Sequence, residues 1–289
     1  MQKGGTKKQI TKPQHQPRPG LEQRMKPLPV FDRPEATAAS KLKSKIALIT
    51  GGDSGIGKAV AVLFAREGAD IAISYLNEHA DARETKRIIE EECGRQCLLL
   101  PGDISKEKHC ITIVKKTIRE YGRIDILVNN AAVHYENDGL EKLSTREMKK
   151  TFETNIYSYF WITKAALGGM KKGGCIVNST SVTAYRGSST LIDYAATKGA
   201  IVSFTRSLAS NLMKKKIRVN GVAPGPIWTP LIPSSFKATK AAQHGSDSPM
   251  ERVGQPAEIA PCYLFLACED SSYMSGQILH PNGGEVVNG

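Results

Sequence analysis

Apolar and polar positions alternate along the chain in a regular rhythm that begins at Lys45. Short runs rich in β-branched residues, each ending in turn residues, predict seven strands: Ile46–Thr50, Ile71–Tyr75, Cys97–Leu100, Ile124–Val128, Cys175–Asn178, Ile217–Val222 and Gln277–Leu279. Helix-length patterns separate them, at residues 55–68, 79–93, 105–121, 145–170, 190–213 and 256–268. We therefore expect an α/β fold, a single doubly wound domain with a seven-stranded, mainly parallel sheet and helices on both faces.

The first 40 residues break this rhythm. They hold six of the fifteen prolines and few apolar residues before Leu28–Phe31. A segment of this composition buries too little apolar surface to order itself. The sequence thus divides into a basic, proline-rich N-terminal arm, residues 1–40, and a folded domain, residues 41–289. Composition favours a solvated tail for the arm, and the alternative is an arm that packs across a neighbouring subunit.

Composition limits the class of protein. The chain of 289 residues is 40% hydrophobic and 24% charged, which is ordinary for a soluble globular protein. No apolar run approaches the ~18 residues of a membrane span, and the basic start lacks the apolar core of a secretory signal. We expect a cytoplasmic protein with no membrane partner. The six cysteines contain no C-x-x-C pair and the six histidines no H-E-x-x-H motif, which favours reduced thiols and predicts no metal site.

The net charge of +12 raises the question of nucleic acid. Residues 1–40 contribute eight Lys and Arg against three Asp and Glu. The rest of the sequence has no basic stripe with interleaved aromatic residues, no zinc-finger spacing and no basic helix followed by heptads. A basic balance alone predicts weak association with polyanions, so no specific nucleic-acid partner is expected.

A glycine-rich turn follows the first predicted strand. The segment Thr50-Gly-Gly-Asp-Ser-Gly-Ile-Gly57 leads from that strand into a helical pattern. Glycines let the backbone approach a ligand, and the N-terminus of a helix offers free amides and a partial positive charge to a pyrophosphate. Within a βαβ series this turn predicts a dinucleotide site of the Rossmann type. A plain tight turn is the alternative.

One tyrosine has a neighbour suited to acid–base chemistry. Among the nine tyrosines only Tyr194 has a lysine four residues on, Lys198, on the same face of a predicted helix. A free phenol titrates near pH ~10, and an adjacent cation lowers its pKa by roughly 1–3 units. We therefore expect Tyr194 to be poised for proton transfer near neutral pH. A surface helix pair is the other interpretation.

The motifs and their order resemble the short-chain dehydrogenase/reductase family. The matching segments are T-G-x-x-x-G-x-G from Thr50, Asn129-Asn-Ala-Ala132, S-x12-Y-x3-K from Ser181 to Lys198, and Pro224-Gly-Pro-Ile-Trp-Thr229. Ala132 stands where that family usually has glycine, which adds one methyl at a close backbone approach. The resemblance implies an NAD(P)-dependent oxidoreductase that transfers a hydride between nicotinamide and an alcohol or carbonyl substrate.

The resemblance also implies roles for particular residues. Tyr194 gives or takes the hydroxyl proton, Ser181 orients the substrate oxygen, and Lys198 lowers the pKa of the tyrosine and grips the ribose. Asn155 holds a water in the proton path. Without the resemblance, Ser181 is equally a helix cap and Asn155 a local kink. The implied cofactor contacts, besides Tyr194 and Lys198, are Thr50, Gly51, Asp53, Ser54, Gly55, Ile56, Gly57, Tyr75, Leu76, Asn77, Asp103, Ile104, Asn130, Ala131, Ala132, Pro224, Gly225, Ile227 and Thr229.

The sequence leaves the choice between NAD and NADP open. The stretch Ser74–Asn77, at the end of the second predicted strand, has no acid to hold the ribose hydroxyls of NAD and no arginine for the 2′-phosphate of NADP.

Residues 226–255 predict a mobile lid over the substrate. Apolar side chains in this loop would contact the substrate, and two pairs near the predicted strand ends would line the pocket: Trp228, Leu231, Ile232 and Phe236 in the loop, His134 with Tyr135, and Arg186 with Ser188. An ordinary flexible loop is the alternative.

The segment Pro19–Pro29, together with the glycine turn, resembles a bacterial subgroup of general-stress proteins, glucose/ribitol-type dehydrogenases and aldehyde reductases. That resemblance implies a sugar, polyol or aldehyde substrate. The family also implies a homotetramer, in which we expect the arm to lie on a neighbour.

Two other classes of function stay open on the sequence alone. One is a nonenzymatic dinucleotide-binding sensor of the same fold, because fold does not fix function. The other is a nucleic-acid-associated protein that uses the basic arm, which predicts steeply salt-dependent binding.

Overall fold

Parallel strands form the centre of the molecule. The structure is a computed structural model that describes residues 8–32 and 38–287; the remaining parts of the arm and the last two residues lie outside it. One seven-stranded sheet runs in the order β3-β2-β1-β4-β5-β6-β7, and every pair in it is parallel. The strands are β1 (Ile46–Thr50), β2 (Asp70–Tyr75), β3 (Cys97–Pro101), β4 (Ile126–Asn129), β5 (Cys175–Ser179), β6 (Arg218–Val222) and β7 (Ile278–Leu279). The chain order reverses between β1 and β4, where such sheets bind ligands beyond the carboxyl ends of their strands.

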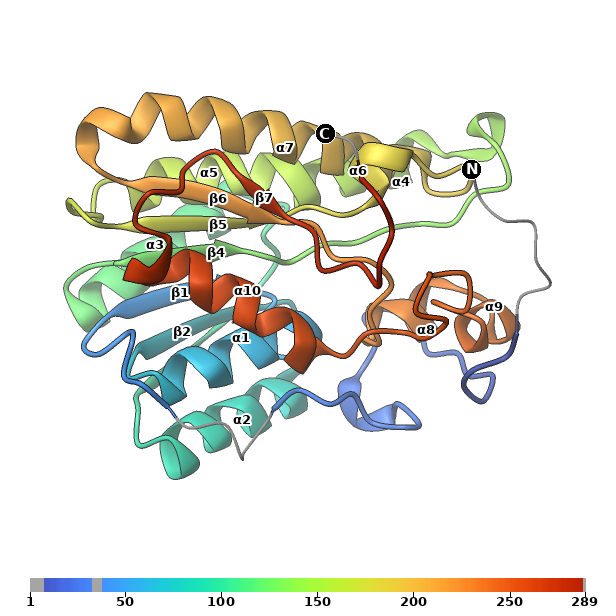
Figure 1. Ribbon diagram of the computed structural model, residues 1–289, viewed down its shortest axis with the longest axis horizontal. Coiled ribbons are helices and arrows are strands. Elements are labelled where there is room, and N and C mark those ends of the chain that lie inside the picture. Colours follow the sequence, from blue (N-terminus) through green and yellow to red (C-terminus); the bar gives the residue numbers. More distant parts are fainter. Residues whose placement is uncertain (1–7, 33–37, 288–289) are drawn as a thin grey trace.

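Helices cover both faces of this sheet (Figure 1). The α-helices are α1 (Gly55–Arg66), α2 (His79–Arg87), α3 (Glu107–Tyr121), α4 (Thr145–Phe152), α5 (Ser158–Ala166), α6 (Thr183–Arg186), α7 (Ile192–Leu212), α8 (Leu231–Ser235), α9 (Ala238–Ala242) and α10 (Pro256–Ala267). Short 3-10 segments are η1 (Glu22–Arg24), η3 (Leu140–Lys142), η5 (Met213–Lys215) and η6 (Glu269–Ser271), and π-helical turns are η2 (Ile88–Glu92) and η4 (Glu153–Tyr157). The predicted doubly wound α/β fold is confirmed.

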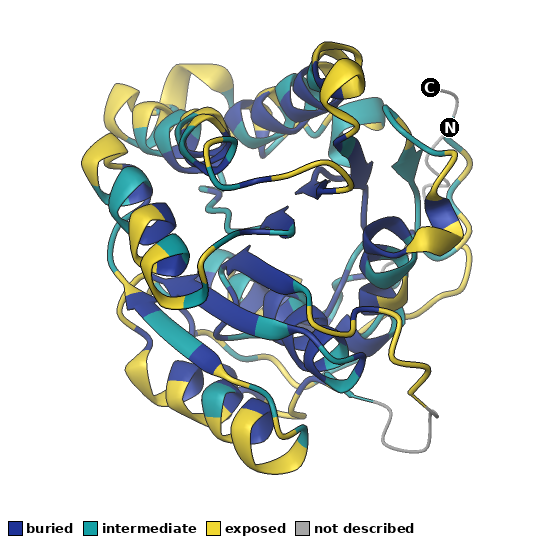
Figure 2. Ribbon diagram, turned by 90° about the vertical axis from the view of Figure 1, so that its left-hand side faces the viewer, coloured by how far each residue is buried: buried dark blue, intermediate teal, exposed yellow. Residues whose placement is uncertain are grey.

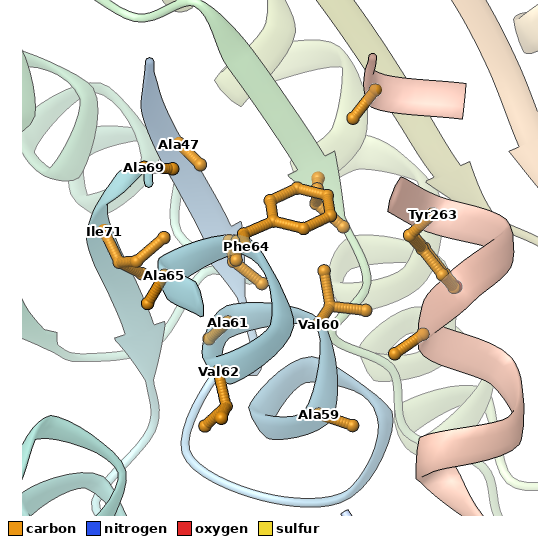
Figure 3. Close-up of a cluster of buried hydrophobic side chains, with 14 of the residues drawn as sticks. Ala47, Ala59, Val60, Ala61, Val62, Phe64, Ala65, Ala69, Ile71 and Tyr263 are labelled. Carbon is orange, nitrogen blue, oxygen red and sulfur yellow. The ribbon is translucent and has the colours of Figure 1, made fainter. Parts of the chain in front are cut away.

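The two hydrophobic cores follow from the period of two along each strand. In β1, Ala47 and Ile49 face one core while Leu48 faces the other. The first core lies under α1 and α10, where Phe64 of α1 and Tyr263 of α10 are fully buried (Figure 3). The second lies under α3, α5 and α7. Because both faces of the sheet are covered, the strands are continuous apolar runs in the sequence. The exposed residues lie on the outer faces of the helices (Figure 2).

Two predicted segments differ from the sequence reading. The helix expected over 145–170 is α4 and α5 joined by the π-helical turn η4, because the extra residue in that turn shifts the helix face. The loop expected over 226–255 contains α8 and α9, whose apolar residues pack inward with Trp228 and Phe236. We call residues 226–255, the segment predicted to cover the substrate, the lid from here on.

The composition-based preference for a solvated tail is wrong for residues 8–32 of the arm. Thr11 N–H donates to the carbonyl of Ala242 at 3.0 Å, and Gln16 N–H donates to that of Pro233 at 2.8 Å. Met25 is 2% exposed within the lid's hydrophobic cluster. In Figure 1 the blue arm accordingly runs alongside α8 and α9. Few residues are apolar here, but backbone hydrogen bonds to the lid order the segment.

No helix in the described part of the chain is long and apolar enough to cross a membrane.

Candidate active site

The glycine turn between β1 and α1 is closed by backbone contacts that leave no room for side chains. A Cβ at Gly57 would lie 1.8 Å from the carbonyl oxygen of Gly51, and Gly51 itself has φ +64°. Only glycine fits both positions. The N-cap residue Ser54 does not cap the helix, and its hydroxyl donates to Asp53 at 2.9 Å instead. The first-turn amides of α1 have no partner one turn back, so this terminus suits a phosphate group.

The end of β4 is clamped to the end of β1. The Thr50 hydroxyl accepts the backbone N–H groups of Asn130 at 2.9 Å and Ala131 at 3.1 Å. The Asn130 amide donates to the carbonyls of Thr50 and Gly51 at 3.1 and 3.3 Å. Asn129, one residue earlier, is fully buried and bonds Asn178 of β5. The two asparagines therefore hold the strand ends together.

The Pro224–Thr229 segment meets the same turn. A Cβ at Gly55 would lie 3.0 Å from the Thr229 methyl, and a Cβ at Gly225 would lie 2.7 Å from the Asn282 Cα atom. Ile227 forms a parallel bridge with Gly254 at the end of the lid. The structure thus brings three of the predicted cofactor motifs, which lie up to about 175 residues apart in sequence, to one edge of the sheet.

Carboxylates gather at the end of β2, where the adenosine ribose is expected. Burial, with a further contribution from Glu78, raises the pKa of Asp53 to about 7. Tyr75 is buried and its hydroxyl bonds His79, whereas Leu76 is exposed. The backbone N–H of Asn77 donates to Glu78 at 2.8 Å.

Two predicted contacts at the end of β3 have protein partners. Asp103 forms an ion pair with Lys150 of α4 at 2.7 Å and accepts the Ser105 N–H at 2.9 Å. Burial raises the pKa of Asp103, but the hydrogen bonds from Lys150 and Ser105 outweigh it, so the pKa lies below its ordinary value. Ile104 is buried in the second core, and its carbonyl accepts the Cys110 thiol.

The four residues of the predicted chemistry lie close together at the carboxyl ends of the strands. Lys198 Nζ lies 5.3 Å from the centre of the Tyr194 ring, one turn away on α7. The Ser181 hydroxyl hydrogen-bonds the Tyr194 phenol and accepts the Thr183 N–H at 3.2 Å. The residue Lys198 is 2% exposed, and its ammonium donates to the Ser179 carbonyl at 2.8 Å. The predicted juxtaposition of tyrosine, lysine and serine is present.

The expected direction of the tyrosine pKa is wrong for the protein's own groups. Burial raises the pKa of Tyr194 to about 12, and the hydrogen bond from Ser181 only partly offsets it. Burial also lowers the pKa of Lys198 to about 7, because its ammonium is desolvated with a carbonyl as its partner. Desolvation therefore sets the direction of both pKa shifts. A further positive charge near the phenol, such as an oxidised nicotinamide, favours the phenolate.

Asn155 lies in the π-helical turn η4, and its side chain is fully engaged. Its oxygen accepts the Val133 N–H at 2.9 Å, and its amide donates to the Val133 carbonyl at 2.8 Å and to the Thr197 hydroxyl at 3.3 Å. Short π segments inside helices are frequent at functional sites. Here the π turn places Asn155 between the segment after β4 and helix α7, so it fixes the spacing of those two elements.

The residues predicted to line the substrate pocket lie in different surroundings. His134 is 3% exposed and packs on Tyr194, with 5.2 Å between ring centres. Tyr135 lies beneath the Arg18 guanidinium of the arm. Arg186 pairs with Glu285 at 3.2 Å, which accounts for its charge without a ligand.

The sequence reading missed two residues that support the site. Ser179 follows directly after the predicted strand Cys175–Asn178; its carbonyl accepts a hydrogen bond from Lys198, and its hydroxyl lies 2.6 Å from the Tyr263 hydroxyl. Glu22 of the arm accepts the Gly55 N–H at 2.8 Å and pairs with Lys58 at 2.7 Å. Burial outweighs Lys58 and raises the pKa of Glu22. A signal was present, because Lys58 lies among apolar residues near the start of a helix whose other cation, Arg66, is its last residue, and a buried lysine requires a partner.

The donor set fits a dinucleotide. Glycines at closed positions, uncapped amides at the start of α1 and a buried lysine beside a phenol supply what the pyrophosphate and the nicotinamide ribose require. Within the first turn of α1, the Gly55 amide already donates to Glu22 and is not free for a phosphate.

Known proteins are similar to this chain in sequence and in fold. A family model described as Enoyl-(Acyl carrier protein) reductase matches residues 51–285. General stress protein 39 of Bacillus subtilis is 53% identical, over 93% of this chain and 94% of that protein. The chloroplastic NADPH-dependent aldehyde reductase 1 of Arabidopsis thaliana is 50% identical, over 93% and 96%. The glucose and ribitol dehydrogenase of Daucus carota is 48% identical, over 94% and 95%.

Solved structures agree with these relatives. A short-chain dehydrogenase from Burkholderia cenocepacia J2315, crystallised in complex with NADP, is 30% identical with a TM-score of 0.79, over 84% of this chain and 98% of that one. The comparisons confirm the resemblance drawn from the motifs and give no support to a nonenzymatic sensor. The chain belongs to the short-chain dehydrogenase/reductase family of NAD(P)-dependent oxidoreductases.

Proposed function

We propose that Tyr194 is the proton donor and acceptor in hydride transfer between NAD or NADP and an alcohol or carbonyl group of a sugar, polyol or aldehyde. The observation that carries this proposal is the buried cluster of Tyr194, Ser181 and Lys198 beside the glycine turn. The aldehyde and polyol classes come from the names of the Arabidopsis and carrot relatives. The bound nicotinamide supplies or accepts the hydride.

Each polar side chain has a distinct task in this proposal. In reduction, the protonated Tyr194 phenol donates its proton to the substrate oxygen as negative charge develops there. The Ser181 hydroxyl donates a second hydrogen bond to that oxygen and fixes its place. Lys198 holds the ribose and stabilises the phenolate that remains. Asn155 keeps the segment after β4 in register with α7 and supports the proton path to the lysine.

The test follows NADH and NADPH absorbance separately with a panel of sugars, polyols and aldehydes. The Tyr194→Phe variant is expected to lose at least about 1,000-fold in kcat, because the acid–base group is gone while the ring remains. Dinucleotide binding, followed by fluorescence, is expected to stay within about twofold of wild type. Wild-type kcat in this variant would remove Tyr194 from the mechanism.

We also infer a homotetramer in the cytoplasm. Tyr157 and Phe160 of the η4–α5 segment are 48% and 51% exposed, and Phe160 stacks on Phe204 of α7. Large apolar side chains exposed together support a contact with another copy. The six cysteines are all free thiols, which supports a reducing compartment. Light scattering at micromolar concentration is expected to give four times the chain mass, and a monomer mass would refute the assembly.

A further inference from the structure

His134 is a buried polar side chain that the proposed mechanism does not use. It lies five residues after the end of β4, is 3% exposed, and its Nδ1 atom is buried with no hydrogen-bond partner among the described residues. Burying an imidazole nitrogen without a partner costs free energy, so native proteins rarely leave one unpaired. The position therefore calls for an explanation outside the chain's own contacts.

The ring of His134 lies between Tyr194 of the active site and Phe236 of the lid. Its centre lies 5.2 Å from that of Tyr194 on α7 and 5.1 Å from that of Phe236 at the end of α8. The Asn155 side chain fixes the preceding residue, Val133, because it accepts the Val133 N–H and donates to the Val133 carbonyl. His15 of the arm bonds the carbonyl of Phe236 at 3.1 Å. Both walls around the imidazole are thus fixed, and the ring cannot leave the site without moving the lid.

The imidazole is neutral over the whole physiological range. Burial lowers the pKa of His134 to about 3, and the nearby cations Arg18, His244, Lys198 and Lys240 act in the same direction. These cations come from the arm, the lid and α7, the elements packed around the ring. A neutral imidazole has one donor and one acceptor nitrogen. A hydroxyl group has both capacities as well, whereas a carboxylate only accepts and an ammonium only donates.

We propose that His134 is a specificity-determining residue that hydrogen-bonds a second hydroxyl group of the substrate, next to the carbon whose oxygen faces Tyr194. The two ring centres are 5.2 Å apart, so the hydroxyl that His134 would bond is one close to the reacting carbon in the substrate. The substrate class is then the α-hydroxy aldehydes and polyols, favoured over aldehydes without a neighbouring hydroxyl. This proposal rests on the proposed function, because it places the reacting carbon at Tyr194.

Glyceraldehyde and propanal test it as a matched pair, since they share a three-carbon skeleton and differ in the two hydroxyls. The wild type is expected to have a higher kcat/KM for glyceraldehyde than for propanal. His134→Phe is expected to lower the ratio of these two kcat/KM values roughly 10- to 100-fold, through changes in KM and kcat for glyceraldehyde alone. His134→Gln restores a neutral donor and acceptor and is expected to recover part of the ratio. Equal effects on both aldehydes, or none on either, would overturn the proposal.

A control separates this effect from the loss of any buried imidazole. His280 also has a buried Nδ1 atom with no partner in the described part of the chain, and its ring packs on Tyr185 instead. His280→Phe is expected to leave the aldehyde ratio unchanged. If His134→Phe does not fold, His134→Leu and His134→Gln decide the same ratio, and a wild type without preference for glyceraldehyde refutes the proposal with no variant at all.

A binding measurement keeps the proposal separate from the activity. In protein labelled with ¹⁵N-histidine, the ring signal of His134, assigned by its loss in a variant, is expected to shift when ribitol is added and to stay in place with 1-pentanol. If propanal is reduced but ribitol leaves this signal unmoved, only the role of His134 fails. If neither dinucleotide supports reduction of any aldehyde while ribitol still shifts the signal, the proposed function fails and the hydroxyl contact stands.

Discussion

The two sides of the active site are built by different means. On the dinucleotide side, glycines pack against backbone atoms, as where Gly57 faces the carbonyl of Gly51. On the substrate side, the lid is held by side chains and backbone groups from an arm some 200 residues away, as where the Trp228 indole donates to the Pro27 carbonyl at 2.8 Å. The first kind of contact joins residues close together in the sequence, and the second joins residues far apart. A single substitution in the glycine turn should therefore abolish dinucleotide binding, whereas one at the arm–lid contact should only weaken the packing of the lid.

The largest effect is expected at the glycine turn. Gly57→Ala would place a methyl 1.8 Å from a backbone oxygen, which no side-chain movement relieves. We expect the dissociation constant for NADH and NADPH to rise at least about 100-fold, because the turn must open and the first amides of α1 move. Fluorescence titration measures it. The same change at Gly168, whose Cβ would meet its nearest atom at an ordinary 3.7 Å, serves as the control. Similar dissociation constants for the two variants would show that the glycine turn does not bind the dinucleotide.

The next effect concerns the link between the arm and the dinucleotide side. Glu22→Ala leaves Lys58 buried without its carboxylate, and breaking a buried pair from one side costs about 3–5 kcal/mol. Urea unfolding measures this loss. Glu84→Ala removes an exposed partner of Arg87 and is expected to cost about 1 kcal/mol or less. Equal losses in the two variants would mean that the arm contributes nothing special to stability.

A smaller effect is expected where the arm packs on the lid. Met25→Ala removes a side chain that is 2% exposed and lies in one cluster with Trp228 and Ile232, and it should cost about 2–3 kcal/mol. Because the loss is local, hydrogen exchange of the lid amides should quicken more than that of the sheet. Leu28→Ala, at a residue 60% exposed, should change neither. Unchanged hydrogen exchange of the lid amides in Met25→Ala would show that the lid keeps its structure without the arm.

The effect that is smallest near neutral pH grows as the pH falls, and it lies on the substrate side alone. The pKa of His134 falls from an ordinary value near 6.5 to about 3 in the folded chain. Above pH ~6.5 both states are neutral and nothing is lost, whereas below it the unfolded chain takes up a proton that the folded chain refuses. Stability of the wild type relative to His134→Phe should therefore fall by about 1.4 kcal/mol per pH unit from pH ~6 downward. Parallel pH profiles of unfolding would contradict the neutral imidazole.

The sequence predicts the features that local rules govern. Alternating β-branched runs predict the strands within one or two residues, and the glycine turn predicts the closed backbone at Gly51 and Gly57. The spacing of Tyr194, Lys198 and Ser181 predicts their meeting, since one helix turn and one strand end fix it. The roles of these residues stay predictions until variants are measured.

The features that the sequence does not predict depend on contacts between residues far apart in the chain. Composition cannot place an arm whose order comes from backbone bonds to the lid, as between Gln16 and Pro233. The direction of the Tyr194 pKa also escapes it, because desolvation depends on everything packed around the ring. Helices α8 and α9 escape it for a further reason. Each is five residues long, too short to stand by local propensity.

Ser179 has a consequence for how this protein tolerates change. Through its two oxygens it connects the ammonium of Lys198 with the phenol of Tyr263 on α10, and its hydroxyl also meets Asn130 at 3.2 Å. A helix on the far side of the sheet thereby helps to set where the lysine's charge sits. Residues deep in α10 are thus constrained by the reaction as well as by the filling of the interior, and a volume-preserving exchange such as Tyr263→Phe is expected to register in turnover even where the fold absorbs it.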